Sequence, residues 1–326
     1  MDFNHNVNGA KHGCFCQIFF GKTWYIVTFY FLAAWVLRSE RDFKRFFWSI
    51  FIPLSIAVVI TLYRYSFYDF DFAFVEKVMN PMFRNHVNYA CIMVLFLPYI
   101  WFMLLQESRF NLKYWLLLGS IFLFIFAIQT SYTRAAYIAG FAAVGYYFII
   151  KWRLTKFSLL AVSIVAIAWL TYVVNDGKYL DFAPNFEKTI THRDFNNLVE
   201  ATAKGEDIST MERVYRWVAG FHMVGERPWV GFGPNNFVNF YKKYSVSSFK
   251  TYVSDNKDNS TVHCYYLLVA VEQGIIGLLI FMALVFYTLI IGERVYHQSK
   301  GFERSFAMAS TLSFFIILLL LLINEF

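Results

Sequence analysis

The hydrophobic pattern of the chain consists of long, uninterrupted apolar runs separated by short polar clusters. Most runs approach the roughly 20 residues with which a helix crosses the hydrocarbon core of a bilayer. Because backbone groups in lipid must be hydrogen-bonded within their own segment, each run is predicted to be a helix, and the lack of alternation disfavours a β-barrel. The pattern predicts an all-α, polytopic integral membrane protein of about eight transmembrane helices. The predicted spans are 23–37, 46–63, 87–105, 114–129, 135–150, 157–174, 264–292 and 305–323.

The longest run, 264–292, is predicted to contain extra helix outside the bilayer or a break near Gly274 and Gly277. Glycine inside a helix lowers its stability and is frequent where a membrane helix is interrupted.

Composition supports the membrane class and excludes others. Hydrophobic residues make up 58% of the 326 residues and charged residues only 16%, whereas soluble domains carry about 25% charge. The mean hydropathy is +0.46 and the pI is near 9.1. No separate soluble domain is left to bind nucleic acid, so the expected surroundings are membrane lipids and no nucleic-acid partner is expected.

The excess of positive charge lies in four short connectors. Connectors 38–45, 106–113, 151–156 and 293–304 together hold 12 Lys and Arg but five Asp and Glu, which accounts for the formal net charge of +7. Short loops rich in Lys and Arg stay in the cytoplasm. We therefore expect both termini and the long segment 176–262 to face outward. The expected organisation is a six-helix transmembrane region (1–175), a large outer loop (176–262) and a C-terminal two-helix region (263–326).

The outer loop carries signals of local order. Ser209 and Glu212 have the spacing of a capping box, and residues 211–224 have the period of an amphipathic helix. Its apolar stripe is expected to lie on the membrane surface, which would also place the helix beside a lipid-linked substrate. The residues predicted on another face of this helix are Arg213, Arg216, Trp217 and Gly220.

Three features are candidates for chemistry at the outer membrane face. Arg134 begins a helix whose N-terminal dipole disfavours a cation, so it needs an anionic partner or open water. His263 precedes an inward-running helix, where a neutral imidazole able to accept a proton is expected. Arg213 and Arg216 can bind phosphate through paired hydrogen bonds.

Each candidate also has a structural interpretation. Arg134 could snorkel to lipid phosphates, His263 could be a structural residue of the interface, and Arg213 with Arg216 could form a solvated charged surface. Taken together, the candidates predict a site that holds a lipid-linked phosphate or pyrophosphate, because such a group lies at headgroup level. The histidine would then be the proton acceptor.

Six short motifs follow one another between residues 80 and 290. They are NHVNYA (85–90), SYTRAA (131–136), ERVYRW (212–217), RPWVGFGPNNF (227–237), HCYYL (263–267) and EQGIIG (272–277). In this order they resemble the O-antigen ligase and O-antigen polymerase superfamily of bacterial envelope proteins. Each motif is degenerate, whereas the ordered set is fairly specific.

The resemblance implies a membrane glycosyltransferase of the bacterial inner membrane, with the large loop in the periplasm, that serves lipopolysaccharide or related polysaccharide biosynthesis. The donor would be a glycan on undecaprenyl diphosphate, and the acceptor would be lipid A core for a ligase or a second lipid-linked glycan for a polymerase. Arg134 and Arg213 would contact the diphosphate, with Arg216 as the alternative to Arg213, and His263 would activate the acceptor hydroxyl. No metal or other cofactor is implied. Further candidate substrate contacts are His86, Asn88, Asn235 and Asn236.

The residues also leave other hypotheses open. The chain has fewer predicted helices before the large loop than the ligases typically have, which predicts a shortened member or a fragment. Asp69 and Asp71 would suit Mg²⁺ or Mn²⁺ in a metal-dependent transferase, whereas the aromatic residues around them equally fit an interfacial belt. A transporter or flippase would need ionisable groups near the bilayer midplane. Only Glu272 lies inside an apolar run, near its outer end.

Overall fold

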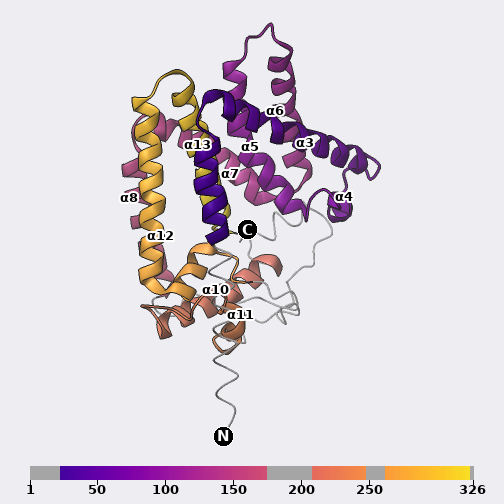
Figure 1. Ribbon diagram of the computed structural model, residues 1–326. Coiled ribbons are helices and arrows are strands. Elements are labelled where there is room, and N and C mark those ends of the chain that lie inside the picture. Colours follow the sequence, from indigo (N-terminus) through magenta and orange to yellow (C-terminus); the bar gives the residue numbers. More distant parts are fainter. Residues whose placement is uncertain (1–22, 175–207, 247–260, 324–326) are drawn as a thin grey trace. The chain divides into compact units, whose positions relative to one another are not determined.

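The computed structural model describes residues 23–174, 208–246 and 261–323, and all regular structure in these ranges is helical (Figure 1). The elements are η1 (Val27–Leu32), α2 (Ala33–Val36), α3 (Glu40–Ser66), η2 (Phe72–Phe74), α4 (Val75–Met79), α5 (His86–Gln106), α6 (Leu112–Thr130), α7 (Arg134–Lys151), α8 (Thr155–Val174), α10 (Ile208–Glu226), α11 (Phe237–Phe240), η4 (Tyr241–Lys243), α12 (Tyr265–Gln298) and α13 (Gly301–Leu320).

The apolar runs predicted from the sequence all form helices in the described residues. Six helices are long and apolar enough to cross a membrane, namely α3, α5, α6, α8, α12 and α13. The first run forms a shorter apolar helix, Thr23–Val36. Helix α7 is bounded by Arg134 and Lys151, so its uncharged stretch is short. The chain is an all-α polytopic membrane protein, and the described residues contain six helices of spanning length where about eight were expected.

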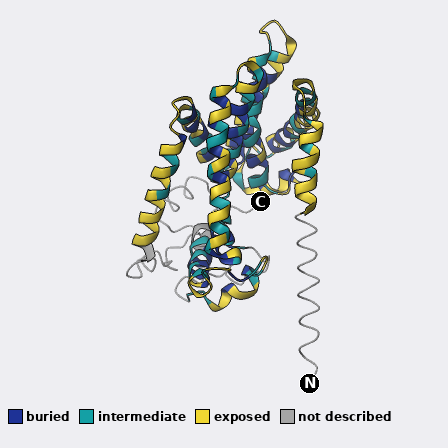
Figure 2. Ribbon diagram, turned by 60° about the vertical axis from the view of Figure 1, so that its left-hand side comes forward, coloured by how far each residue is buried: buried dark blue, intermediate teal, exposed yellow. Residues whose placement is uncertain are grey.

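The chain divides into two compact units, residues 1–59 and 60–326. In the described part of the first unit the rings of Phe47 and Phe51 stack along α3, with centroids 5.2 Å apart. The second unit contains every candidate site residue. Figure 2 shows buried residues concentrated on its central helices, whereas the apolar side chains of α8 are largely exposed, as suits a helix in contact with lipid.

Hydrogen bonds between helices fix the register of the second unit. Tyr99 Oη donates to Ser310 Oγ at 3.2 Å and Ser313 Oγ donates to the Leu95 carbonyl at 2.9 Å, so α5 and α13 are antiparallel. The Tyr265 N–H donates to the Leu321 carbonyl at 2.9 Å, which brings the start of α12 to the end of α13.

The start of α7 lies beside the start of α5, because Thr133 Oγ1 donates to the His86 carbonyl at 3.4 Å. The first turns of α5, α7 and α12 and the last turn of α13 therefore lie at one end of the bundle, which we call the His263 end. At the opposite end, called the Arg304 end, His297 Nε2 donates to the Ile150 carbonyl at 2.8 Å and α13 begins.

Candidate functional site

The frame of the candidate site is a break in α12. Gly274 has a φ of 72° and interrupts an otherwise helical backbone. In a continuous helix the Val271 carbonyl would accept from the Ile275 N–H. Here the Val271 carbonyl accepts from the Phe232 N–H at 2.9 Å, and the Ile275 N–H donates to the Pro228 carbonyl at 2.7 Å. The loop after α10 thus satisfies both backbone groups that the break exposes.

Two glycines make this contact possible. A Cβ atom on Gly274 would lie 2.1 Å from the Trp229 carbonyl oxygen, and one on Gly231 would lie 2.5 Å from the Val271 carbonyl oxygen. Both glycines have a positive φ, a backbone conformation that other residues rarely adopt. Gly231 and Gly274 are therefore packing positions between loop and helix. The predicted break near Gly274 is confirmed.

Helix α10 packs on protein along its apolar stripe. Tyr215, Val218, Ala219 and Met223 are buried in one cluster, whose other members are Phe232, Phe237, Tyr241, Val262, Leu267 and Val271. The stripe therefore does not lie down on the membrane surface, as the sequence pattern alone suggested, because the loop and the first turn of α12 cover it.

A second face of α10 approaches the start of α12. A Cβ on Gly220 would lie 3.0 Å from Leu267 Cδ2 and 3.4 Å from Val262 Cγ2, so the two backbones come close there. Gly220 shares this face with Arg213, Arg216 and Trp217, since residues three and four apart are neighbours on a helix. The packing thus brings the polar face of α10 to the segment that carries His263.

His263 lies in the short turn before α12, with a φ of 55°. Burial lowers the pKa of its imidazole to about 4, and the positive charges of Arg216 and Arg213 add to the effect. The ordinary value is about 6.5. The side chain is therefore neutral at neutral pH and carries a lone pair that can accept a proton.

Arg216 connects α10 to the segment before His263. It is only 5% exposed, its Nη1 donates to the Thr261 carbonyl at 3.2 Å, and its Nη2 lies 3.6 Å from Glu212 Oε2. The Glu212 carboxylate lies one helical turn before Arg216 on α10 and forms this ion pair with it. The side chain of Ser209, the other member of the predicted capping box, lies outside the described residues. Arg213 is half-buried, which leaves it the more accessible guanidinium of the pair.

Two further donors beside Arg216 were not among the site residues predicted from the sequence. In the part of the chain that the structure describes, Trp217 Nε1 and Thr261 Oγ1 are buried without a hydrogen-bond partner. A buried donor left unpaired costs about 1–3 kcal/mol, so such groups need an explanation. The spacing of Trp217 four residues after Arg213 could have indicated a shared face, but its burial depends on the packing of α10.

A second group of predicted residues lies at the start of α5 and α7. Thr133 connects Arg134 to His86 through the bond to the His86 carbonyl, and His86 Nδ1 bonds Glu76 Oε1. Asn88 is half-buried in the first turn of α5, where its N–H donates to Asn85 Oδ1 at 2.8 Å. The helix register puts this group at the His263 end of the bundle.

Other predicted side chains take part in local structure. Asn236 Nδ2 donates to the Phe232 carbonyl at 2.9 Å and its Oδ1 accepts from Asn239 at 3.2 Å, so it shapes the loop, whereas Asn235 is exposed with a φ of 60°. Asp71 Oδ1 accepts from the Ala73 N–H at 2.9 Å and caps η2. Within the described residues, no cluster of three or more His, Cys, Asp or Glu is placed to hold a metal ion.

Comparison with known families identifies the region that contains these residues. Residues 116–282 match the profile of a family described as O-antigen ligase. The match begins in α6, ends in α12 and includes Arg134, Arg213, Arg216 and His263. His86 and Asn88 lie before the matched residues. No curated protein matches the chain.

Proposed function

The chain belongs to the O-antigen ligase family, and we propose that it is a glycosyltransferase that moves a glycan from a polyprenyl diphosphate carrier to an acceptor hydroxyl. The membrane-spanning helices and the family support an enzyme of the ligase or polymerase type. The observation that carries the finer proposal is a neutral, half-buried histidine beside two arginines, one of which is held rigidly by its own contacts.

In the proposed reaction, the acceptor oxygen attacks the anomeric carbon of the donor glycan. The bond from that carbon to the diphosphate oxygen breaks, and its electron pair leaves with the diphosphate. The acceptor proton passes to the lone pair of His263. Cationic groups beside the leaving group stabilise the negative charge that develops on it, which is usually the largest catalytic contribution.

The arginines divide the work in this proposal. Arg213, the more accessible one, contacts the diphosphate through paired hydrogen bonds, whereas Arg216 keeps the Thr261 segment in place. Trp217 Nε1 and Thr261 Oγ1 donate further hydrogen bonds to oxygens of the carrier-linked glycan. This role accounts for their burial without a protein partner in the described residues. Arg134 would add a cation from the first turn of α7.

The proposed side of the membrane follows from charge. The connectors at the Arg304 end are rich in Lys and Arg, so this end is assigned to the cytoplasm. The His263 end then faces the periplasm of a bacterial inner membrane, and the diphosphate of an undecaprenyl carrier would lie there at headgroup level. Lipid A core is the proposed acceptor, as for a ligase; polymerisation of lipid-linked repeats is the alternative outcome.

The test is restoration of surface glycan in a strain that lacks the protein. We expect His263→Ala, Arg134→Ala and Arg213→Ala each to impair restoration at normal membrane levels, with His263→Ala lowering transfer at least about 100-fold. The controls are His222→Ala and Arg109→Ala, two exposed residues of the same types. Normal glycan from all three site variants would overturn the assignment.

The glycan pattern of the deletion strain identifies the acceptor. Loss of long chains from the lipid A core, with carrier-linked polymer still present, supports ligation. Accumulation of single-repeat products would instead assign the protein to polymerisation.

A further inference from the structure

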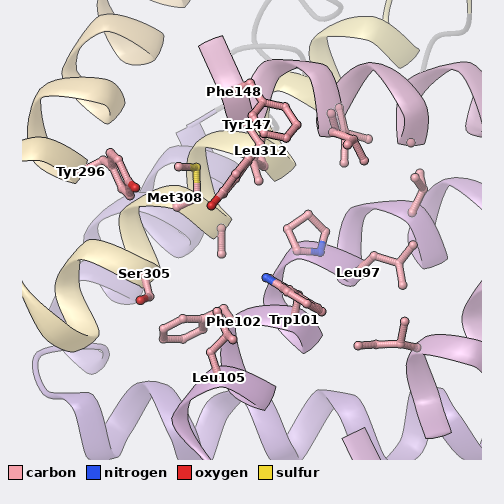
Figure 3. A pocket seen from close by; sticks show the side chains of 18 of the residues that line it. Leu97, Trp101, Phe102, Leu105, Tyr147, Phe148, Tyr296, Ser305, Met308 and Leu312 are labelled. Atoms are coloured by element: carbon pink, nitrogen blue, oxygen red, sulfur yellow. The ribbon is translucent and has the colours of Figure 1, made fainter. Parts of the chain in front are cut away.

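A cavity of about 590 Å³ opens among α5, α6, α7, α12 and α13, apart from the residues of the candidate site. Its wall is almost entirely apolar and includes Leu97 and Trp101 of α5, Ile125 of α6, Val144 of α7, and Met308 and Leu312 of α13. In Figure 3 the side chains of Leu97, Trp101, Tyr147 and Met308 surround an open space. Since these helices lie in a membrane protein, an apolar ligand can enter from the bilayer.

The dimensions of the cavity suit one lipid chain. On α5 its lining extends from Val94 to Leu105, which corresponds to about 16 Å along a helix axis. This is roughly half the thickness of a bilayer hydrocarbon core. The cavity therefore extends over the depth of one leaflet.

One end of the cavity carries a fixed cation. Arg304 lines the cavity, and its guanidinium lies over the Tyr296 ring at 4.6 Å and donates from Nη2 to Tyr296 Oη at 3.1 Å. Ser305, the next residue, also lines the cavity, and Figure 3 shows it on the same side as Tyr296. A guanidinium oriented by a ring keeps further N–H donors available for a planar or tetrahedral anion.

The surroundings of Arg304 are basic. In the connectors at this end, Lys and Arg outnumber the acids, which are Glu107, Glu293 and exposed Glu303. The Glu293 carboxylate is buried and accepts from the Thr155 N–H at 3.0 Å, so it is turned to the protein interior. The bases of these connectors are Arg109, Lys113, Lys151, Arg153, Lys156, Arg294, Lys300 and Arg304.

We propose that this cavity binds an anionic glycerophospholipid, with one acyl chain between α5, α7 and α13 and the phosphate on Arg304. The apolar wall fits the chain, and the guanidinium complements the headgroup charge. The glycan carrier is a poorer fit, because its diphosphate is proposed to lie at the His263 end, whereas the arginine that lines this cavity lies at the Arg304 end. The cavity and its arginine are observed independently of the proposed function, whereas the choice of a phospholipid over the glycan carrier rests on it.

The experiment is a lipid titration of the purified full-length protein in detergent, followed by native mass spectrometry. The probes are phosphatidylglycerol, phosphatidylcholine with the same acyl chains, and undecaprenyl phosphate. We expect phosphatidylglycerol to bind about tenfold more tightly than phosphatidylcholine, and Arg304→Ala to remove that preference, as expected for loss of a charge-assisted hydrogen bond. The matched control is Arg294→Ala, an exposed arginine at the same end that does not line the cavity.

A second variant tests the position of the chain. Val144→Trp fills the cavity from its rim and should weaken both phospholipids, with thermal unfolding used to verify that each variant folds. Equal effects of Arg304→Ala and Arg294→Ala, equal binding of the two phospholipids, or full binding to Val144→Trp would overturn the proposal. Binding of undecaprenyl phosphate in preference to phosphatidylglycerol would overturn it as well, by assigning the cavity to the carrier.

Discussion

At His263, burial and two guanidinium groups act in the same direction on one imidazole. The cost of protonating this ring is high while the site holds no anion. A bound diphosphate would place negative charge beside Arg213 and Arg216 and so offset their effect on the histidine. In the proposed mechanism, the proton affinity of His263 therefore rises when the donor binds, which is when the acceptor must lose its proton.

The pH dependence of kcat/KM tests this coupling. Since the pKa of His263 is lowered to about 4, the neutral base is present above that value, and activity should fall only as the pH drops through about 4. Arg213→Gln removes one positive charge, so the acid limb of the profile should move to higher pH, toward the ordinary value of about 6.5. The Arg109→Gln control should leave the limb in place. An acid limb that stays fixed in Arg213→Gln would contradict the coupling.

Folding stability should depend on the same group. A histidine whose pKa is lowered in the folded state binds protons more readily when unfolded, so its contribution is fully present above about 6.5. That contribution should be lost as the pH falls toward about 4. Thermal unfolding of wild type and His263→Gln between these values provides the measurement. Parallel losses of Tm in the two proteins would show that other groups dominate.

Trp217 provides a separate test of the donors beside Arg216. Trp217→Phe keeps most of the aromatic packing and removes Nε1, which is buried without a partner in the described residues. The rate of glycan transfer should fall about tenfold if this N–H binds the carrier-linked glycan. The unfolding temperature should stay level or rise, because an unpaired buried N–H is removed. Trp229→Phe is the matched control, because Trp229 is 66% exposed. Unchanged kcat/KM in Trp217→Phe would show that Nε1 does not contact substrate.

At the scale of helices and loops, the site depends on an interruption in α12 whose exposed backbone groups are hydrogen-bonded by another segment. The Gly274 break removes a helical hydrogen bond, and the loop 227–236 replaces it with backbone groups of its own. Irregular backbone in a membrane protein is tolerated where other protein groups satisfy it. The same contact fixes the loop that follows α10 and helps to hold the α10 residues beside His263.

Gly274→Ala should disrupt this contact. The added Cβ would lie 2.1 Å from the Trp229 carbonyl oxygen at a φ of 72°, so we expect a loss of more than about 1 kcal/mol in stability and loss of transfer. Gly119→Ala in α6 is the control, since among the described residues its added Cβ would have no neighbour within 4 Å outside the adjacent backbone of its own helix. Thermal unfolding and limited proteolysis of the loop provide the measurements. A Gly274→Ala protein as stable as Gly119→Ala would refute the role of the break.

At the scale of the whole molecule, the ends of the bundle differ in chemistry. Within the second unit, the candidate site residues lie at the end where α5, α7 and α12 begin, and connectors 106–113, 151–156 and 293–304 lie at the other end. This difference between the two ends supports the proposal that the His263 end faces the periplasm, because positively charged short loops remain in the cytoplasm.

Labelling of single cysteines tests the orientation. After replacement of the four native cysteines, Lys242→Cys and Arg109→Cys introduce thiols at two exposed positions. A membrane-impermeant maleimide added to the periplasmic side should label position 242 and leave position 109 unmodified until the membrane is opened. The reverse pattern would place the His263 end in the cytoplasm and rule out the proposed carrier side.

Hydropathy by itself determined the all-α class and the positions of the apolar helices, because spanning a bilayer imposes a length and an internal hydrogen-bond pattern that are local in the chain. The glycines of the longest run predicted a break near Gly274 as one of two alternatives, and the structure decided for the break. The ordered motifs likewise indicated the family. Only the tertiary structure decided that α10 packs on the loop and on α12, that Arg216 is committed to Glu212 and Thr261, and that Asn236 serves the loop. These outcomes depend on contacts between segments far apart in sequence, which determine burial and charge at His263 and which no local periodicity encodes.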